Sequence, residues 1–508
     1  MFTELSYGEP MLSRSGLAVP VFRDGRAMYS LYDPRRDAEI FASQAELNEP
    51  GCALVVGIGD GSHIAALHRR YPKTRLIAAE YSRADIDFLY SHFDLSELAK
   101  NPAVVLCTIN DLLQAIPDSF IPVLHGSFLV LYQRAWRNFH AQDCEKIEEA
   151  IFFALEKVKN DYAAQGMFGK IWHRNILQNL QTALTLPPCR EPVFLPVEGE
   201  TCIAAAGPSL DRATGMLAGE RCRVIAADTA YPALLRRGVA PLVAYTIDGQ
   251  IHSVRHFMRS IDPRTVLAAD LCCNPVIPRL FAAKGNRVIF TGNRHPLCRL
   301  FARYLQRSGA PDSLLPEIDA GSGAVAIAAY DFARKAGCRP VAVFGADFAY
   351  INGKPYASGT YFEEMFHGAS TRIDTAETRY TALMYRGKTR TEKREGRRII
   401  TTPLLDSYRE SFQELQKKVF AGQNPFHSGV LAPYSEGFFD WYLKALKENL
   451  ERAKEGKAPD AEILASCLPL GAWKAGKNPA KPNVFSILKL AYNLTERYTK
   501  RQYESKNG

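Results

Sequence analysis

The sequence predicts an α/β protein in which a central parallel sheet is preceded by a smaller α/β domain and followed by a helical region. Short apolar segments alternate with helical ones through the middle of the chain, which is typical of a parallel sheet with helices on both faces. Glycine-rich turns come directly after apolar strands in both α/β parts. Amphipathic helical patterns take over in the last quarter of the chain.

Length and composition indicate an ordinary globular protein. The 508 residues predict two to four domains, and the chain is 47% hydrophobic and 23% charged. No apolar run reaches the roughly 18 residues that a membrane-spanning helix needs. The first residues lack the basic start and apolar core of a secretory signal. We therefore expect a cytoplasmic protein with no membrane span.

Cysteine usage and charge limit the kinds of site and partner. The 11 cysteines contain no CxxC pair, so we expect free thiols in a reducing compartment and no metal site. The net charge of +9 gathers in residues 386–398 and in the tail from Lys474. These clusters are interpreted as solvated surfaces or, for the first one, as a contact for an anionic donor or acidic partner. No aromatic residues interleave with them, so no nucleic-acid partner is expected.

The N-terminal part is expected to contain a β-rich cap over 1–48 and a Rossmann-like domain over 49–190. An apolar strand beginning at Cys52 enters a GxGxG turn, and Glu80 follows about twenty residues later. Dinucleotide and adenosyl-methionine folds place a ribose-binding acid at this spacing. The module is interpreted either as structural or as a small-molecule site. Four prolines between 187 and 196 set the boundary after a long helical stretch.

The central domain is expected over 191–375. Its predicted strands are 201–206, 222–227, 241–247, 265–270, 286–290 and 340–346. Ligands bind at the carboxyl ends of the strands in such sheets. Polar residues follow several strands there, including Asp228, Thr229, Asp248 and Asp347.

Two glycine-rich turns in this domain each open a helix. The first is Gly207-Pro208-Ser209 and the second is Gly321-Ser322-Gly323. The start of a helix presents free amide groups and a positive dipole end, which suit a phosphate. Two such turns predict a nucleotide-containing ligand.

The C-terminal region, 376–508, is predicted to hold a basic hairpin and helices. A short strand at 397–402 closes the hairpin. The expected amphipathic helices are 405–420, 436–456 and 484–503.

Four sequence pieces resemble the motility-associated factor (Maf) flagellin glycosyltransferases and, more distantly, the bacterial CMP-sialic-acid transferases. The pieces are Ala206-Gly207-Pro208-Ser209-Leu210, Ala227-Asp228-Thr229-Ala230, Gly321-Ser322-Gly323, and Gly345-Ala346-Asp347-Phe348 with Tyr350, Asn352-Gly353 and Tyr356. The resemblance implies a sialyltransferase-type central sheet. It also implies transfer of a nonulosonic acid (pseudaminic, legionaminic or sialic-acid-like) from a CMP donor to serine or threonine of flagellin.

The resemblance also implies roles for single residues. Tyr350 and Tyr356 match the paired tyrosines that meet the departing CMP, so no metal or other cofactor is expected. The acceptor hydroxyl also needs a general base. His367, eleven residues past Tyr356, is the first candidate on chemical grounds although its spacing differs from the sialyltransferase pattern, and Asp347 is the second. The remaining expected substrate contacts are Gly207, Pro208, Ser209, Asp228, Thr229, Asp248, Gly321, Ser322, Gly323 and Gly345.

Two alternatives stay open at the level of the sequence. The same segment is similar to the archaeal 6-hydroxymethylpterin pyrophosphokinases (MptE-like), and Asp228, Asp248 and Asp347 together have the ligand chemistry for a magnesium ion. The sialyltransferases carry asparagine where this chain has Ala206 and again at Asp228. These departures keep a third interpretation open, a flagellin-binding protein without catalysis.

Overall fold

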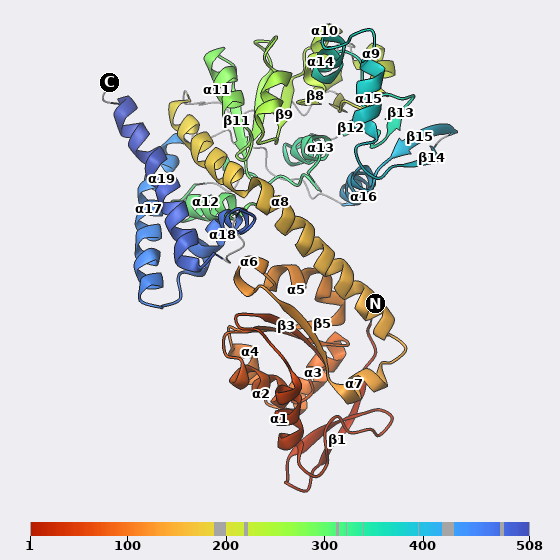
Figure 1. Ribbon diagram of the computed structural model, residues 1–508, viewed down its shortest axis with the longest axis vertical. Coiled ribbons are helices and arrows are strands. Elements are labelled where there is room, and N and C mark those ends of the chain that lie inside the picture. Colours follow the sequence, from red (N-terminus) through yellow and green to blue (C-terminus); the bar gives the residue numbers. More distant parts are fainter. Residues whose placement is uncertain are drawn as a thin grey trace. The chain divides into compact units, whose positions relative to one another are not determined.

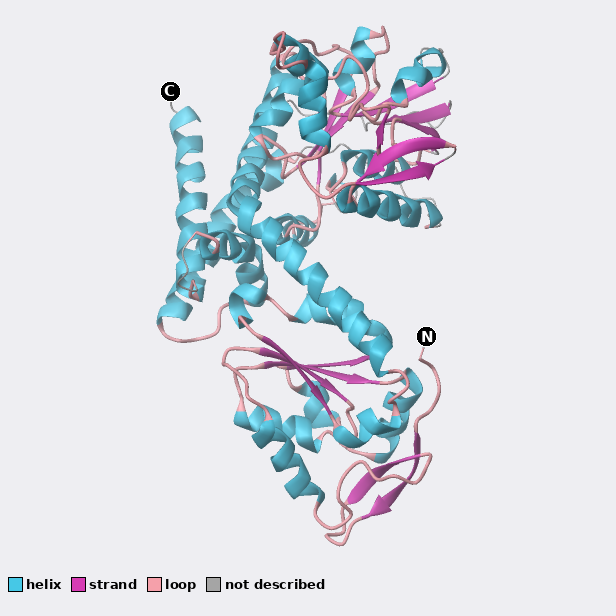
Figure 2. Ribbon diagram, turned by 45° about the vertical axis from the view of Figure 1, so that its right-hand side comes forward, coloured by secondary structure: helices cyan, strands magenta, loops and turns pink. Residues whose placement is uncertain are grey.

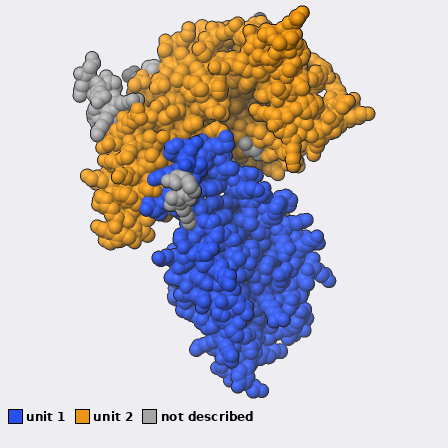
Figure 3. All heavy atoms as spheres, in the orientation of Figure 1, with its two compact units in different colours: residues 1–167, 471–484 blue, residues 168–470, 485–508 orange. Residues whose placement is uncertain are grey.

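The chain divides into two compact units, which we describe separately (Figure 3). Unit 1 comprises residues 1–167 and 471–484, and unit 2 comprises 168–470 and 485–508. The computed structural model describes residues 2–186, 200–217, 222–310, 314–321, 323–338, 340–394, 396–418, 431–477 and 482–506.

Unit 1 is built on a four-stranded parallel sheet with the order β5-β4-β3-β6 (Figure 1). Every residue of β3 is buried, as expected for a strand that is covered on both faces. A two-stranded antiparallel hairpin, β1–β2, precedes this sheet. The strands are β1 (Tyr7–Leu12), β2 (Ala18–Phe22), β3 (Cys52–Val56), β4 (Arg75–Glu80), β5 (Val104–Thr108) and β6 (Phe128–Tyr132).

Short helices surround the sheet of unit 1, and the long helix α8 begins in unit 1 and continues along the chain into unit 2. The cap expected to be β-rich contains the helix α1, which begins where Asp33 accepts a hydrogen bond from the Arg36 amide and Pro34 takes the first helical position. The helices are α1 (Pro34–Gln44), α2 (Ser62–Arg70), α3 (Arg83–His92), α4 (Ser96–Lys100), α5 (Leu112–Ser119), α6 (Pro122–His125), α7 (Arg134–Phe139) and α8 (Cys144–Thr185).

Side chains of unit 1 itself fill its glycine-rich turn. Gly57 has a φ of 96°, and a Cβ there would lie 2.8 Å from the ring of Trp136. Glu80 is buried and accepts hydrogen bonds from the Trp136 indole at 2.5 Å, the Tyr7 hydroxyl at 3.0 Å and the Ile58 amide at 2.8 Å. Glu80, the acid at the spacing typical of a ribose contact, is therefore a hydrogen-bond acceptor in the core of unit 1. This arrangement supports the structural interpretation of the module.

Unit 2 contains the predicted six-stranded parallel sheet, with the order β11-β10-β9-β8-β7-β12. The expected strands are confirmed to within about two residues at each end. They are β7 (Glu200–Ala204), β8 (Cys222–Ala227), β9 (Val243–Thr246), β10 (Val266–Asp270), β11 (Val288–Thr291) and β12 (Pro340–Phe344).

Helices cover both faces of this sheet, and alternate residues of each strand meet one face or the other (Figure 2). In β7, Ile203 packs in the cluster that contains α13, whereas Cys202 and Ala204 pack with α9. The helices of this part are α9 (Leu210–Leu217), α10 (Tyr231–Arg236), η2 (Ile251–His256), α11 (Val276–Ala283), α12 (Pro296–Arg307) and α13 (Val325–Lys335).

The predicted basic hairpin is present, and it belongs to a small antiparallel sheet with the order β13-β15-β14. Thr402 accepts a hydrogen bond from the Leu405 amide and starts α16 directly after β15. The elements are β13 (Tyr350–Ile351), α14 (Tyr361–Gly368), α15 (Ala376–Met384), β14 (Arg390–Arg394), β15 (Arg397–Thr401), α16 (Pro403–Lys417), α17 (Ala432–Lys454), α18 (Ala461–Ala475) and α19 (Val484–Lys506). Within the described part of the chain, no helix is long and apolar enough to cross a membrane.

Candidate functional site

The first glycine turn is bound along its length to the end of β12. The Gly207 amide donates to the Gly345 carbonyl at 2.8 Å, and the Ser209 amide donates to Asp347 Oδ2 at 2.8 Å. A Cβ on Gly207 would come closer than 3.0 Å to both Asp347 and Gly345. Gly207 therefore lets two backbone segments of this chain approach each other, and the Asp347 carboxylate holds the start of α9.

The ends of β8 and β9 place Asp228 and Asp248 at the same edge of the sheet. Asp228 is buried, and its carboxylate accepts hydrogen bonds from the Thr229 amide at 2.6 Å and from the Thr246 hydroxyl at 2.8 Å. Burial raises the pKa of Asp248, and the charge of Asp228 raises it as well, whereas the Gln250 amide at 2.8 Å acts to lower it. Asp228 ties two loops together, and Asp248 is the carboxylate whose proton affinity the site increases.

The two predicted tyrosines lie near each other and near this edge. Burial raises the pKa of Tyr356 to about 12, with further increases from Tyr350 and Asp228, while Arg386 opposes them. Burial also raises the pKa of Tyr350, and Arg386 again acts in the opposite direction. Both rings are partly buried, and Tyr356 stacks on Phe362 with the centroids 4.6 Å apart. The site therefore offers two protonated phenols beside an arginine.

The predicted base His367 has different neighbours. It is exposed in the last turn of α14, where its ring is 6.3 Å from Tyr380 of α15. His256 of η2 is buried, its ring is 6.0 Å from Phe362, and it lies close enough to Asp248 to influence the pKa of that carboxylate. The structure thus brings His256 to the group that contains Asp248 and Tyr356.

The second glycine turn is bordered by another helix of this chain. Gly321 and Gly323 precede α13, which packs on the face of the sheet opposite to α9. A Cβ on Gly321 would lie 2.8 Å from the Cβ of Ser411 in α16, so a helix of this chain covers the turn. Ser322, expected as a substrate contact, lies outside the described residues.

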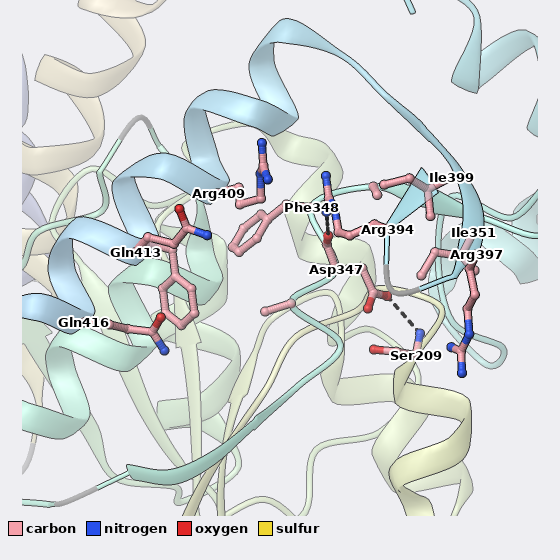
Figure 4. Close-up of a pocket in the computed structure, with 13 residues that line it drawn as sticks. Ser209, Asp347, Phe348, Ile351, Arg394, Arg397, Ile399, Arg409, Gln413 and Gln416 are labelled. Atoms are coloured by element: carbon pink, nitrogen blue, oxygen red, sulfur yellow. Dashed lines mark hydrogen bonds between the residues drawn. The ribbon is translucent and has the colours of Figure 1, made fainter. Parts of the chain in front are cut away.

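A pocket of about 370 Å³ opens next to the first turn (Figure 4). It lies between the end of β12, the small antiparallel sheet and α16. Its lining residues are Ser209, Ala346, Asp347, Phe348, Ala349, Ile351, Arg394, Arg397, Ile399, Arg409, Phe412, Gln413 and Gln416.

The aspartates proposed for magnesium do not form a ligand set. Among the residues that the structure describes, no group of three or more histidine, cysteine, aspartate or glutamate side chains is arranged to hold a metal ion. Asp228 and Asp347 each bind groups of this chain, as described above.

Sequence reasoning missed His256, Tyr408 and Arg386 as neighbours of the predicted tyrosines. Tyr408 lies on α16 and contributes to the raised pKa of Tyr356. A sequence signal existed for Arg386, which begins the basic segment interpreted as a contact for an anionic donor. Nothing in the local sequence marks His256 or Tyr408, because their proximity arises from the packing of η2 and α16.

The fold matches that of a solved glycosyltransferase. The structure of the MAf glycosyltransferase from Magnetospirillum magneticum AMB-1 matches with a TM-score of 0.54 at 12% sequence identity, over 98% of this chain and 87% of that one. A family model described as 6-hydroxymethylpterin diphosphokinase MptE-like matches residues 174–353. Both parts of the resemblance noted from the sequence, a Maf-type fold and an MptE-like central domain, are therefore confirmed.

One relative places the chain in a family. An uncharacterized protein of Treponema pallidum (strain Nichols) is 33% identical over 247 residues, which cover 48% of this chain and 80% of that protein. A second uncharacterized protein of the same organism is 32% identical over 139 residues, covering 27% of this chain and 65% of the relative. The chain belongs to the same family as the first of these treponemal proteins.

Proposed function

We propose that this chain is a glycosyltransferase that moves a nonulosonic acid from a CMP donor to serine or threonine hydroxyls of flagellin. The observation that carries the proposal is the pair Tyr350 and Tyr356, which lie beside Arg386 at the carboxyl edge of a sheet of Maf glycosyltransferase fold. Ligands bind at this edge in such sheets. The donor, the acceptor and the independence from a metal are parts of the proposal.

The tyrosines would act on the leaving group. When the bond between sugar and phosphate breaks, negative charge develops on the phosphate of CMP and must be met in the transition state. Tyr356 and Tyr350 carry their protons at neutral pH, since a phenol has an ordinary pKa of about 10 and burial raises the pKa of both further. Two phenol O–H groups and the Arg386 guanidinium are suitable donors to that charge.

The acceptor hydroxyl needs a group that takes its proton. We assign this role to His256, because a histidine suits proton transfer near neutral pH and this one lies near Asp248 and Phe362. Asp248 would hold the imidazolium that forms. The proton thus moves from the acceptor to His256 while CMP leaves at the tyrosines.

The test of this function is sugar transfer by the purified chain from CMP-linked nonulosonic acid to flagellin, read as a mass increase of flagellin. We expect a Tyr350→Phe, Tyr356→Phe double variant to lose at least 100-fold in turnover, since each phenol donor contributes on the order of 2 kcal/mol. Tyr385→Phe is the matched control, because Tyr385 is exposed on the surface. Wild-type turnover in the double variant would contradict the proposed role.

A pterin pyrophosphokinase is the second candidate, favoured by the family model that matches 174–353. It predicts AMP release from ATP that requires both magnesium and a 6-hydroxymethylpterin. If flagellin gains no mass while AMP appears only with both reagents, the pyrophosphokinase replaces the transferase.

A further inference from the structure

The pocket beside the first glycine turn combines three arginines with an apolar wall (Figure 4). Arg394 and Arg397 come from the two strands of the hairpin, and Arg409 comes from α16. All three lie within unit 2.

These arginines keep donors that the protein does not use. The Nε atoms of Arg394 and Arg409 are buried and have no hydrogen-bond partner among the described residues. The other nitrogens of Arg394 donate to the Asp347 carbonyl at 3.0 Å and to Glu392 at 2.7 Å, which fixes the side chain in place. For Arg397, the described part of the chain provides no hydrogen-bond or ion-pair partner. Within the residues that the structure describes, Arg394 and Arg409 thus have partners and still keep an unused N–H donor each, while the donors of Arg397 are all unused.

The balance of charge in the pocket favours an anion. Among the described residues that line it, Asp347 is the one acidic side chain, and its Oδ2 already accepts a hydrogen bond from the Ser209 amide. Glu392 and Asp406 pair with Arg394 and Arg409 from outside the lining. Arg390 also pairs with both of these carboxylates, so four arginines stand against three carboxylates and the pocket keeps an excess of one positive charge.

Other residues that line the pocket form an apolar surface, which suits an organic group attached to the anion. Phe348 and Phe412 lie with their ring centroids 5.7 Å apart, and Ile351 and Ile399 extend the apolar surface. Phe348 has a φ of 45°, a conformation that is unfavourable for a bulky residue and that is found at functional sites. A volume of about 370 Å³ is in the range of small-molecule sites.

We propose that this pocket binds an organic phosphate, with the phosphate held by Arg394, Arg397 and Arg409 and the organic part against Phe348. A carboxylate is satisfied by one bidentate arginine, whereas a phosphate presents three oxygens to several guanidinium groups. The proposal adds a ligand group to the function proposed above and does not require it. The phosphate comes either from the donor nucleotide or from a separate organic phosphate.

Binding of CMP and of phenyl phosphate to the full chain, measured by calorimetry, tests the site without any transfer reaction. Arg397→Gln is compared with Arg398→Gln, since neighbouring residues of a strand point to opposite faces and Arg398 does not line the pocket. We expect at least a tenfold loss of affinity in Arg397→Gln and Arg409→Gln, and wild-type affinity in Arg398→Gln. Unchanged melting temperatures would show that the variants fold.

Two results would overturn the proposal: the wild-type chain binds neither ligand, or Arg397→Gln and Arg398→Gln bind them equally. Competition between the two ligands identifies the source of the phosphate. If phenyl phosphate displaces CMP, the pocket is the phosphate site of a nucleotide. If both bind at once and only phenyl phosphate is lost in Arg397→Gln, it holds a separate organic phosphate. Failure of sugar transfer leaves these measurements unaffected.

Discussion

Gly207 in the first turn and Gly215 in the helix that follows it have very different surroundings. Gly207 sits where the turn after β7 meets the end of β12, and there is no room for a side chain between it and Asp347. Gly215, eight residues further on, lies in α9, where an added Cβ would have nothing within 4 Å. The same substitution should therefore have opposite effects at the two positions.

We predict that Gly207→Ala lowers the free energy of unfolding by about 1–3 kcal/mol, as overpacking does, and abolishes binding at the turn. Gly215→Ala should raise it by about 0.5–1 kcal/mol, because alanine favours a helix interior. Urea unfolding of both variants checks this. A Gly207→Ala variant as stable as the wild type would mean that the turn does not have the close contact described here.

Asp270 at the end of β10 makes stability depend on pH. Its buried carboxylate accepts hydrogen bonds from the Cys272 amide at 2.6 Å and the Asn293 side-chain amide at 2.7 Å, yet burial raises its pKa to about 7. The folded chain therefore binds this proton more tightly than the unfolded chain. Its contribution to stability is full near pH 4 and is lost as the pH rises to 7.

We predict that Asp270→Asn removes this dependence. Each unit of pKa shift corresponds to about 1.4 kcal/mol of stability. Between pH 4 and 7.5 the free energy of unfolding of the wild type should therefore fall, relative to that of the variant, by at most about 4 kcal/mol. Urea unfolding at several pH values gives this difference. Glu80, whose burial also raises its pKa to about 7, is present in both chains and cancels. A constant difference across the range would contradict the assignment.

At the scale of elements, the strands were predictable and some of the helices were not. The strands of both sheets are continuous apolar runs because they are covered on both faces, and the sequence shows such runs directly. The helix α18 was not predicted: it is apolar on most sides and contains Pro469, so it lacks the polar face and carries a helix breaker. The pair Asp33-Pro34 is a typical start of a helix and could have predicted α1, where a β-rich cap was expected.

The site was predictable only as far as it follows the strands. Asp228, Asp248 and Asp347 were expected at the carboxyl edge because parallel strands end together, and they lie there. His256, Tyr408 and the pocket arginines reach the edge through helices and a hairpin, whose packing depends on contacts between distant segments. Periodicity within one segment does not contain that information.

Two histidines on different helices, His256 on η2 and His367 on α14, are the alternatives for the general base, and substitution can distinguish them. We predict that His256→Gln, on η2, lowers sugar transfer by 100-fold or more, since general base catalysis contributes about 10²–10⁴-fold. His367→Gln, on α14, should retain wild-type transfer, because its ring packs at the exposed edge of α15. Turnover of both variants at saturating donor decides it. Loss of activity in His367→Gln alone would return the role to the residue expected from the sequence.

At the scale of the whole molecule, two parallel sheets carry glycine-rich turns and use them differently. In unit 1, Trp136 lies against Gly57 and bonds Glu80, while Met28 and Tyr29 occupy the space beside Gly59. In unit 2, a pocket opens beside the turn at Gly207. The same motif thus serves as core packing in one unit and borders a cavity in the other.

We predict that the full chain does not bind adenosyl-methionine or NAD, because the Glu80 carboxylate already accepts hydrogen bonds from Trp136, Tyr7 and Ile58 and the Trp136 ring lies against Gly57. The melting temperature should shift by less than about 1 °C with either compound at millimolar concentration. A ligand that binds and is present at about 100 times its Kd would instead add about 2.7 kcal/mol to the free energy of unfolding and raise the melting temperature clearly. Equilibrium dialysis with labelled cofactor provides a second measurement that does not depend on stability. Saturable binding that is lost in Glu80→Gln would show that the Trp136 ring moves aside and that unit 1 has a ligand of its own.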